Sequence, residues 1–145
     1  MREVRTEIQI LAPIERVWQV LTDFENWKTW NPTVKQVNGS SSLGSKLDVI
    51  MSGKDCKEMA YHPYVLEAVP PKSFRWRAKM IAEFLFTNDR VFELRENAGG
   101  TIFYHREEFS GLMVPMIWKR LNQFVLPTLE KMNAALKIKL ETSKE

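Results

Sequence analysis

Apolar and polar residues alternate from Val4 to Ile10, a pattern typical of a β-strand with one wet face. From Pro13 to Leu21 the apolar residues recur at helical spacing, and the aromatic residues of Phe24–Pro32 stand three positions apart. Pro32 ends that segment because the residue before a proline disfavours helix. The pattern predicts one strand followed by two short helices.

Between Val34 and Phe109 the chain consists of short alternating segments separated by turn residues. The expected turns lie at Asn38–Gly44, at Pro70–Lys72 and at Asn97–Gly100, which all hold glycine or proline. The expected strands are Val34–Val37, Lys46–Met51, Lys57–Ala68, Ser73–Met80, Glu83–Arg95 and Thr101–Phe109. Within these strands apolar residues fall on one side and polar residues on the other, so the sheet has one apolar face.

After Gly111 the apolar residues return to helical spacing and predict a long amphipathic helix over about Pro115–Leu140. Pro127 lacks a backbone donor and is expected to bend this helix near Gln123–Leu126. The apolar face of the sheet and the apolar stripe of the helix can bury only each other. We therefore expect an α+β fold in which a curved antiparallel sheet of about seven strands wraps around the C-terminal helix. The number of aromatic residues exceeds what one sheet–helix seam needs and points to an internal cavity.

Length and charge limit the classes of protein that fit. A chain of 145 residues is expected to form a single domain, residues 1–145. A net charge of +3 is too small for a dedicated nucleic-acid binder, so no nucleic-acid partner is expected. One cysteine and an N-terminus without an apolar secretion signal favour a cytoplasmic location. The longest uncharged run, Phe109–Trp118, is too short to span a membrane, and the oligomeric state stays open.

Four segments together resemble one known family over essentially the whole chain: Ile10–Pro32, Pro63–Trp76, Arg90–Leu94 and Gly100–Pro115. They are similar to the START-like (SRPBCC) superfamily, of the polyketide cyclase/dehydrase and lipid-transport type. The resemblance implies a helix-grip fold, a deep apolar cavity between sheet and C-terminal helix, and binding of a small molecule or lipid. It does not imply one reaction, because fold and function separate readily. The chain departs from the family pattern at Arg90, where many relatives carry histidine.

The alternation of residues along the strands places several polar side chains together on the inner face of the sheet. If Asn97–Gly100 closes a hairpin, Arg90 lies opposite His105 or Glu107 on the face that also carries Phe92. The cluster could anchor a ligand carbonyl or hydroxyl, or supply His105 and Glu107 as a general acid and base. It could equally be an internal Arg–Glu pair with a purely structural role.

The other candidate binding residues are mainly large apolar side chains, which either line a pocket or fill it. They are Trp27, Trp30, Asn31, Phe74, Trp76, Phe86, Phe92, Phe103, Phe109, Met113, Ile117 and Leu121. Leu112 and Met113, in the link before the C-terminal helix, are either a candidate gate of the cavity or a hydrophobic staple at the start of the helix. His62, His105 and Cys56 lack metal-ligand spacing, and no nucleotide-binding or hydrolase motif occurs, so neither a metal nor a cofactor is expected.

The leading hypothesis is a protein that holds a small hydrophobic or amphipathic molecule in its cavity, with Arg90, His105 and Glu107 at the polar end. The first alternative is an aromatase/cyclase or dehydratase that uses the same cavity. The second is a protein-interaction module that resembles the chaperone-activator branch of the superfamily and uses the outer face of the sheet.

Overall fold

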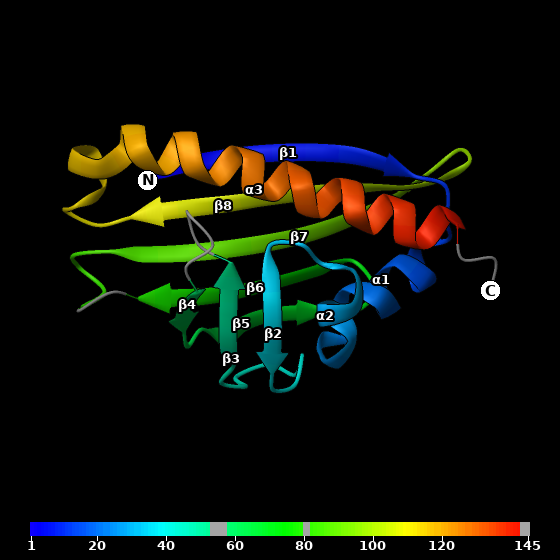
Figure 1. Cartoon of the computed structure of the whole chain (residues 1–145), viewed down its shortest axis with the longest axis horizontal. Helices are drawn as coiled ribbons and strands as arrows, with labels where there is room; N and C mark the ends of the chain where they lie inside the picture. Colours follow the sequence, from blue (N-terminus) through cyan, green and yellow to red (C-terminus); the bar gives the residue numbers. More distant parts are fainter. Residues whose placement is uncertain (53–57, 80–81, 143–145) are drawn as a thin grey trace.

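The computed structural model describes residues 1–52, 58–79 and 82–142 (Figure 1). Its elements are β1 (Arg2–Ile10), α1 (Ile14–Thr22), the 3-10 turn η1 (Phe24–Asn26), α2 (Trp27–Trp30), β2 (Val34–Asn38), β3 (Asp48–Ser52), β4 (Glu58–Tyr61), β5 (Tyr64–Val69), β6 (Ser73–Lys79), β7 (Thr87–Asn97), β8 (Gly100–Ser110) and α3 (Val114–Thr142). The α+β fold class, the two short helices after the first strand and the long C-terminal helix are confirmed.

The strands form two antiparallel sheets. The larger one has the order β1-β8-β7-β6-β5, and the smaller one has the order β2-β3-β4. Helix α3 runs along β1 and β8, while the smaller sheet crosses in front of the remaining strands of the larger one (Figure 1). The larger sheet therefore has its inner face covered partly by the helix and partly by the smaller sheet.

The predicted strand Lys57–Ala68 is wrong as a single element. The structure divides it into β4, in the smaller sheet, and β5, in the larger one, with His62 and Pro63 between them. Pro63 has no backbone N–H to donate to a sheet, which favours a break at this point. Lys57 and Met80, which the sequence analysis placed in strands, lie outside the described residues.

The predicted strand Glu83–Arg95 begins later, because β7 starts at Thr87. The residues before it form a turn in which the amides of Leu85 and Phe86 donate to the Ala82 carbonyl. At its other end β7 joins β8 through the predicted tight turn, where Gly99 has a φ of +94° that favours glycine. Helix α3 continues through Pro127, and the predicted bend there stays a prediction.

The core is divided along the length of α3. The larger cluster lies between α1, η1, α2, both sheets and the C-terminal half of α3, and it includes Trp27, Phe74, Trp76, Phe92, Phe103, Met132 and Leu136. The smaller cluster lies at the other end, where Val4, Phe86, Phe109, Val114, Val125 and Leu129 are buried. Aromatic rings fill the first half, whereas a pocket occupies part of the second.

Candidate binding pocket and its polar end

A pocket of about 370 Å³ lies between the smaller sheet, the inner face of the larger sheet and the N-terminal half of α3. The smaller sheet contributes Met51, Met59, Ala60 and Tyr61 to the pocket wall. The larger sheet contributes Ala78, Lys79, Asn88, Glu107 and Phe109, and the turn before β7 contributes Phe86. Helix α3 contributes Leu121, Phe124, Val125 and Thr128. Most of these side chains are apolar. The volume is within the range of small-molecule sites, at its lower end.

The β7–β8 hairpin sets the polar end of this pocket. In its register Arg90 faces Glu107, one of the two partners that strand parity allowed, and Phe92 faces His105. Because alternate residues share a face, Asn88, Arg90, His105 and Glu107 all point inward from two neighbouring strands. Asn88 and Glu107 line the pocket, whereas Arg90 and His105 lie deeper, toward the aromatic core.

A chain of hydrogen bonds runs through the buried side of this cluster. Arg90 Nε donates to Nε2 of His105 at 3.0 Å, and Nδ1 of His105 lies 2.8 Å from Oδ1 of Asn133 in α3. Nδ2 of Asn133 then donates to Oγ1 of Thr6 in β1 at 2.7 Å. Because Arg90 can only donate, His105 Nε2 must be the acceptor, and the ring proton sits on Nδ1. His105 is thus a neutral imidazole held between a cation and an amide.

Electrostatics keep His105 in this neutral form. Burial lowers its pKa well below the usual value, and the Arg90 charge acts in the same direction, while the hydrogen bond to Asn133 acts against them. The ring is fully buried and does not line the pocket. His105 therefore positions Arg90, and its lone pair is already in use.

Arg90 is the most unusual group of the cluster. Its side chain is 1% exposed, with the guanidinium stacked near the rings of Trp76 and Phe92 at 5.9 and 5.8 Å. Nη2 points at the sulfur of Met132, 3.4 Å away, and Nη1 has no hydrogen-bond partner among the described residues. The ion pairs that the described residues form do not include one between Arg90 and Glu107. A buried N–H without a partner is costly, so an acceptor oxygen at this point would be stabilised.

Two acidic groups border the pocket beside Arg90. Burial raises the pKa of Glu107, while the Arg90 charge and a hydrogen bond from Asn88 act to lower it. Burial raises the pKa of the Tyr61 hydroxyl to about 12. The Arg90 guanidinium offsets part of this rise through its charge and its contact with the hydroxyl, whereas the Glu107 charge adds to it. Tyr61 therefore stays protonated at neutral pH and can donate a hydrogen bond into the pocket.

The predicted site residues separate into three groups. Phe86, Glu107, Phe109 and Leu121 line the pocket. Trp27, Phe74, Trp76, Phe92 and Phe103 are buried in the aromatic core, against which Trp30 packs, and Arg90 and His105 lie between the core and the pocket. Asn31, Met113 and Ile117 are not in the wall: Asn31 accepts hydrogen bonds from Thr33 and Val34, Met113 precedes α3, and Ile117 packs on the smaller core cluster.

Several wall residues were not among the sequence candidates, notably Tyr61, Asn88, Phe124 and Val125. Asn88 shares the inward parity of Arg90, and Phe124 and Val125 belong to the apolar stripe of the helix, so a signal existed for all three. No sequence signal pointed to Tyr61, because its strand β4 and the strand β5 were expected to form one continuous strand in one sheet. Asn133 interrupts the apolar stripe between Met132 and Leu136, which is a sign of a buried polar role.

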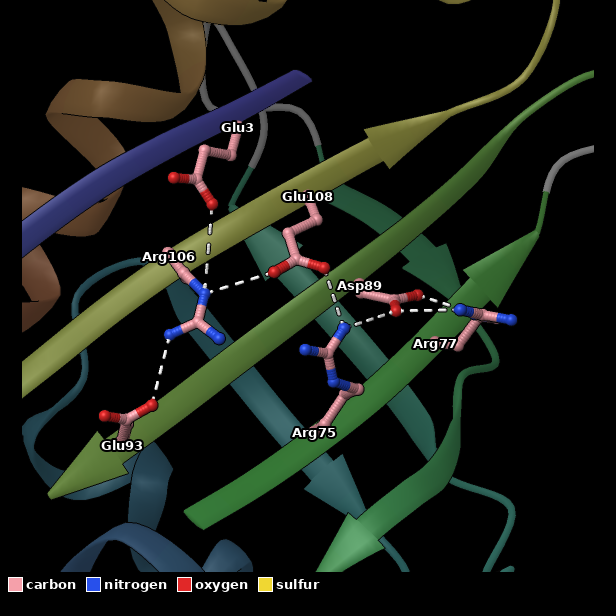
Figure 2. A network of polar contacts seen from close by, with 7 residues as sticks. All are labelled: Glu3, Arg75, Arg77, Asp89, Glu93, Arg106 and Glu108. Atoms are coloured by element: carbon pink, nitrogen blue, oxygen red, sulfur yellow. Dashed lines mark hydrogen bonds and ion pairs between the residues drawn. The ribbon is translucent and has the colours of Figure 1, made fainter. Parts of the chain in front are cut away.

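The outer face of the larger sheet carries a different polar cluster, the outer ion-pair network (Figure 2). Its members are Glu3, Arg75, Arg77, Asp89, Glu93, Arg106 and Glu108, which span four strands. The buried carboxylate of Asp89 accepts from Arg77 Nε at 2.7 Å and from Arg75 Nη1 at 2.8 Å. Arg75 and Arg77 are thus neutralised by acidic neighbours on the same face.

Other classes of site find no counterpart in the part of the chain that the structure describes. There, no three His, Cys, Asp or Glu side chains are grouped so that they could hold a metal ion; Cys56 lies outside it. No described helix is both long enough and apolar enough to cross a membrane.

Residues 1–141 match the family model described as polyketide cyclase / dehydrase and lipid transport. The chain belongs to this family. Comparison with curated proteins gives no match.

Solved structures of the same fold include the di-domain ARO/CYC StfQ from the steffimycin biosynthetic pathway, with a TM-score of 0.80 at 10% identity over 97% of this chain. The chain spans about half of that protein, 51% of its length. MLL2253 from Mesorhizobium loti matches over 99% of this chain and 100% of its own, with a TM-score of 0.78 and 18% identity. TTHA0849 from Thermus thermophilus has the same coverage and TM-score at 16% identity. At these identities the likeness establishes the fold.

Proposed function

We propose that this family member is a cytoplasmic protein that binds a small amphipathic molecule in the pocket, with an apolar body along α3 and an oxygen at the polar end. One observation carries the proposal: buried Arg90, whose Nη1 has no hydrogen-bond partner among the described residues, is a neighbour of Glu107 and Tyr61, which line a mainly apolar pocket. A ligand carbonyl or hydroxyl oxygen accepts from Arg90 or Tyr61. A ligand hydroxyl can also donate to Glu107.

The size and lining of the pocket limit the ligand. About 370 Å³ holds a molecule with one or two rings or a medium-length chain. The family and the ARO/CYC neighbour support a hydrophobic ligand of this kind.

The first test is native mass spectrometry of the purified protein, followed by denaturation to release and identify any carried molecule. The second is calorimetric titration with 1-naphthol and with naphthalene. Because only 1-naphthol offers an oxygen to the polar end, we expect it to bind about tenfold more tightly or better.

Val125→Trp places a large side chain in the pocket wall and is expected to abolish 1-naphthol binding, whereas Gln123→Trp, on the exposed side of the same helix, leaves it intact. Equal affinity for the two probes would exclude the polar end as the recognition element. A bare protein that binds neither probe would contradict the proposal as a whole.

A cyclase or dehydratase activity is the second candidate, and Glu107 favours it. Its raised pKa and its place in the pocket wall suit a general acid or base, while His105 is already occupied by Arg90 and Asn133. In that case Glu107→Gln would leave 1-naphthol affinity within about threefold and remove turnover of a reactive polyketone chain.

A further inference from the structure

Three large apolar side chains are exposed together at one end of the molecule. Phe84 is 68% exposed, Leu112 71% and Met116 83%. Phe84 belongs to the turn before β7, Leu112 to the link between β8 and α3, and Met116 to the first turn of α3. These elements meet at the left end of Figure 1. We call these three residues the apolar tip.

Backbone contacts hold the apolar tip in place. The amide of Leu112 donates to the Phe84 carbonyl at 3.1 Å, and the amide of Met113 donates to the Leu85 carbonyl at 3.0 Å. Gly111 has a φ of +122°, and a Cβ at that position would collide with the Leu85 carbonyl. The link therefore packs directly against the turn before β7, and backbone hydrogen bonds fix the positions from which the exposed side chains project.

Basic residues lie next to the apolar tip. Lys119 and Arg120 follow Met116 by three and four residues, so they share its side of α3, and both are exposed. Neither forms an ion pair within the described part of the chain. Arg2, whose guanidinium lies 5.4 Å from the centre of the Trp118 ring, adds a third cation at this end. Glu83 is an exposed acidic neighbour, so basic charge predominates here.

The pocket lies directly behind the apolar tip. Phe86, two residues after Phe84, and Phe109, three residues before Leu112, are both in the pocket wall. Leu121, one turn beyond Ile117 in α3, is in the wall as well. A surface in contact with the tip is thus also beside the end of the ligand pocket.

We propose that the apolar tip docks the protein onto the surface of an anionic phospholipid bilayer. A few rigid apolar side chains bordered by lysine and arginine suit the interface between headgroups and acyl chains, where apolar burial and attraction to anionic lipid add together. Three side chains offer far less apolar surface than the roughly 800 Å² that each partner buries in a standard protein complex. Docking does not depend on the proposed ligand, and either can fail without the other.

The test is flotation of the full chain with vesicles of phosphatidylcholine alone and of phosphatidylcholine with about a third phosphatidylglycerol. We expect binding to the anionic vesicles only, and less of it as salt is raised from about 0.05 M to about 0.5 M. Leu112→Ser is expected to lower the partition coefficient about tenfold, because one exposed leucine no longer inserts. Lys119→Glu with Arg120→Glu should lower it at least as much.

Ile138→Ser is the matched control, because Ile138 is 63% exposed on the same helix at the opposite end of the molecule. It should bind vesicles like the wild type. Val125→Trp should also bind them, although it blocks the pocket, and this separates docking from ligand binding. The proposal would be overturned if the protein did not float with anionic vesicles, which is also the result expected if the tip contacts a protein instead. It would equally be overturned if Leu112→Ser and Ile138→Ser lost the same amount of vesicle binding.

Discussion

Arg90 is a buried cation whose nearest polar partner is a neutral histidine. The usual way to hold a buried charge is an opposite charge at contact distance, but Glu107 faces Arg90 without forming an ion pair. The His105 ring accepts a hydrogen bond from Nε of Arg90, and the rings of Trp76 and Phe92 lie near the guanidinium. The sequence left open whether Arg90 belongs to a structural ion pair or anchors a ligand. In the structure, Nη1 of Arg90 is a donor without a hydrogen-bond partner among the described residues.

Replacing Arg90 should change the titration of its neighbours. In Arg90→Met the pKa of His105 is expected to rise, because the Arg90 charge is one of the two causes that lower it, and to stay below normal because burial remains. The pKa of Glu107 should also rise, because it loses the cation that favours its ionised form. NMR of the imidazole protons of His105 measures the first of these changes directly. An unchanged His105 titration would contradict the electrostatic account.

His105 should also make the protein less stable in mild acid. Its folded-state pKa lies below the unfolded value of about 6.5, so the unfolded chain takes up the proton first. The free energy of unfolding therefore falls as pH falls below about 6.5, by up to about 1.4 kcal/mol per pH unit, until the folded-state pKa is reached. Glu107 works the other way, because its raised pKa makes the folded state take up a proton first.

His105→Gln keeps an acceptor for Arg90 but removes the titrating ring. Its free energy of unfolding should lose the decline between about pH 6.5 and about pH 5, measured by urea unfolding across this range. Glu107 is present in both proteins, so the difference between the two curves isolates His105. Parallel curves would show that His105 takes up its proton at the same pH in the folded and unfolded chains, which would contradict a lowered folded-state pKa.

At the scale of elements, the outer ion-pair network ties β1, β8, β7 and β6 together across the larger sheet (Figure 2). Arg106 contacts Glu3, Glu93 and Glu108, and Arg75 connects Glu108 to Asp89. Although burial acts to raise it, hydrogen bonds from Arg75 and Arg106 hold the pKa of Glu108 below its usual value. Stability from Glu108 is therefore present above its unfolded pKa and is lost in stronger acid.

Asp89 is the member of this network whose loss should cost most. It is 4% exposed and its carboxylate accepts from two arginines, so Asp89→Asn should lower the free energy of unfolding by about 2–3 kcal/mol. Glu58→Gln breaks the exposed ion pair with Lys35, in which both side chains are at least half exposed, and should cost about 0–1 kcal/mol. Urea unfolding of both variants makes the comparison. Equal losses would mean that burial does not strengthen the network.

Elements whose partners are local in sequence could be predicted, and those with distant partners could not. The β7–β8 hairpin is closed by a two-residue turn, so turn chemistry and parity limited the residue opposite Arg90 to His105 or Glu107, and the structure selects Glu107. Asn133 reaches His105 from 28 residues away, and no local pattern encodes that contact. The assignment of β4 and β5 to different sheets depended on tertiary pairing, with Pro63 as the one local sign. The sequence candidates therefore included part of the pocket wall on the larger sheet and the helix, namely Phe86, Glu107, Phe109 and Leu121, and no residue of the smaller sheet.

At the scale of the whole molecule, the helix grip is asymmetric. Its α1–α2 end is filled by rings in contact: Phe92 lies within 6.0 Å of Trp27, Phe74, Trp76, Phe103 and His105, measured between ring centres. Its other end keeps the pocket, and the polar layer of Thr6, Asn133, His105 and Arg90 separates the two. One half of the core is thus closely packed, and the proposed binding site lies in the other half.

This division predicts that two truncations of phenylalanine differ in their effects on stability and on ligand affinity. Phe92→Ala leaves a hole in a closed aromatic cluster and should lower the free energy of unfolding by about 3–5 kcal/mol. Phe124→Ala removes a partly exposed ring from the pocket wall, where little packing is lost, and should cost about 1–2 kcal/mol while it enlarges the pocket. Chemical unfolding and 1-naphthol titration of both variants test the idea, with Phe124→Ala changing affinity and Phe92→Ala, where it stays folded, leaving affinity within about threefold. If Phe124→Ala destabilised the protein as much as Phe92→Ala, the pocket wall would be part of the packing on which folding depends.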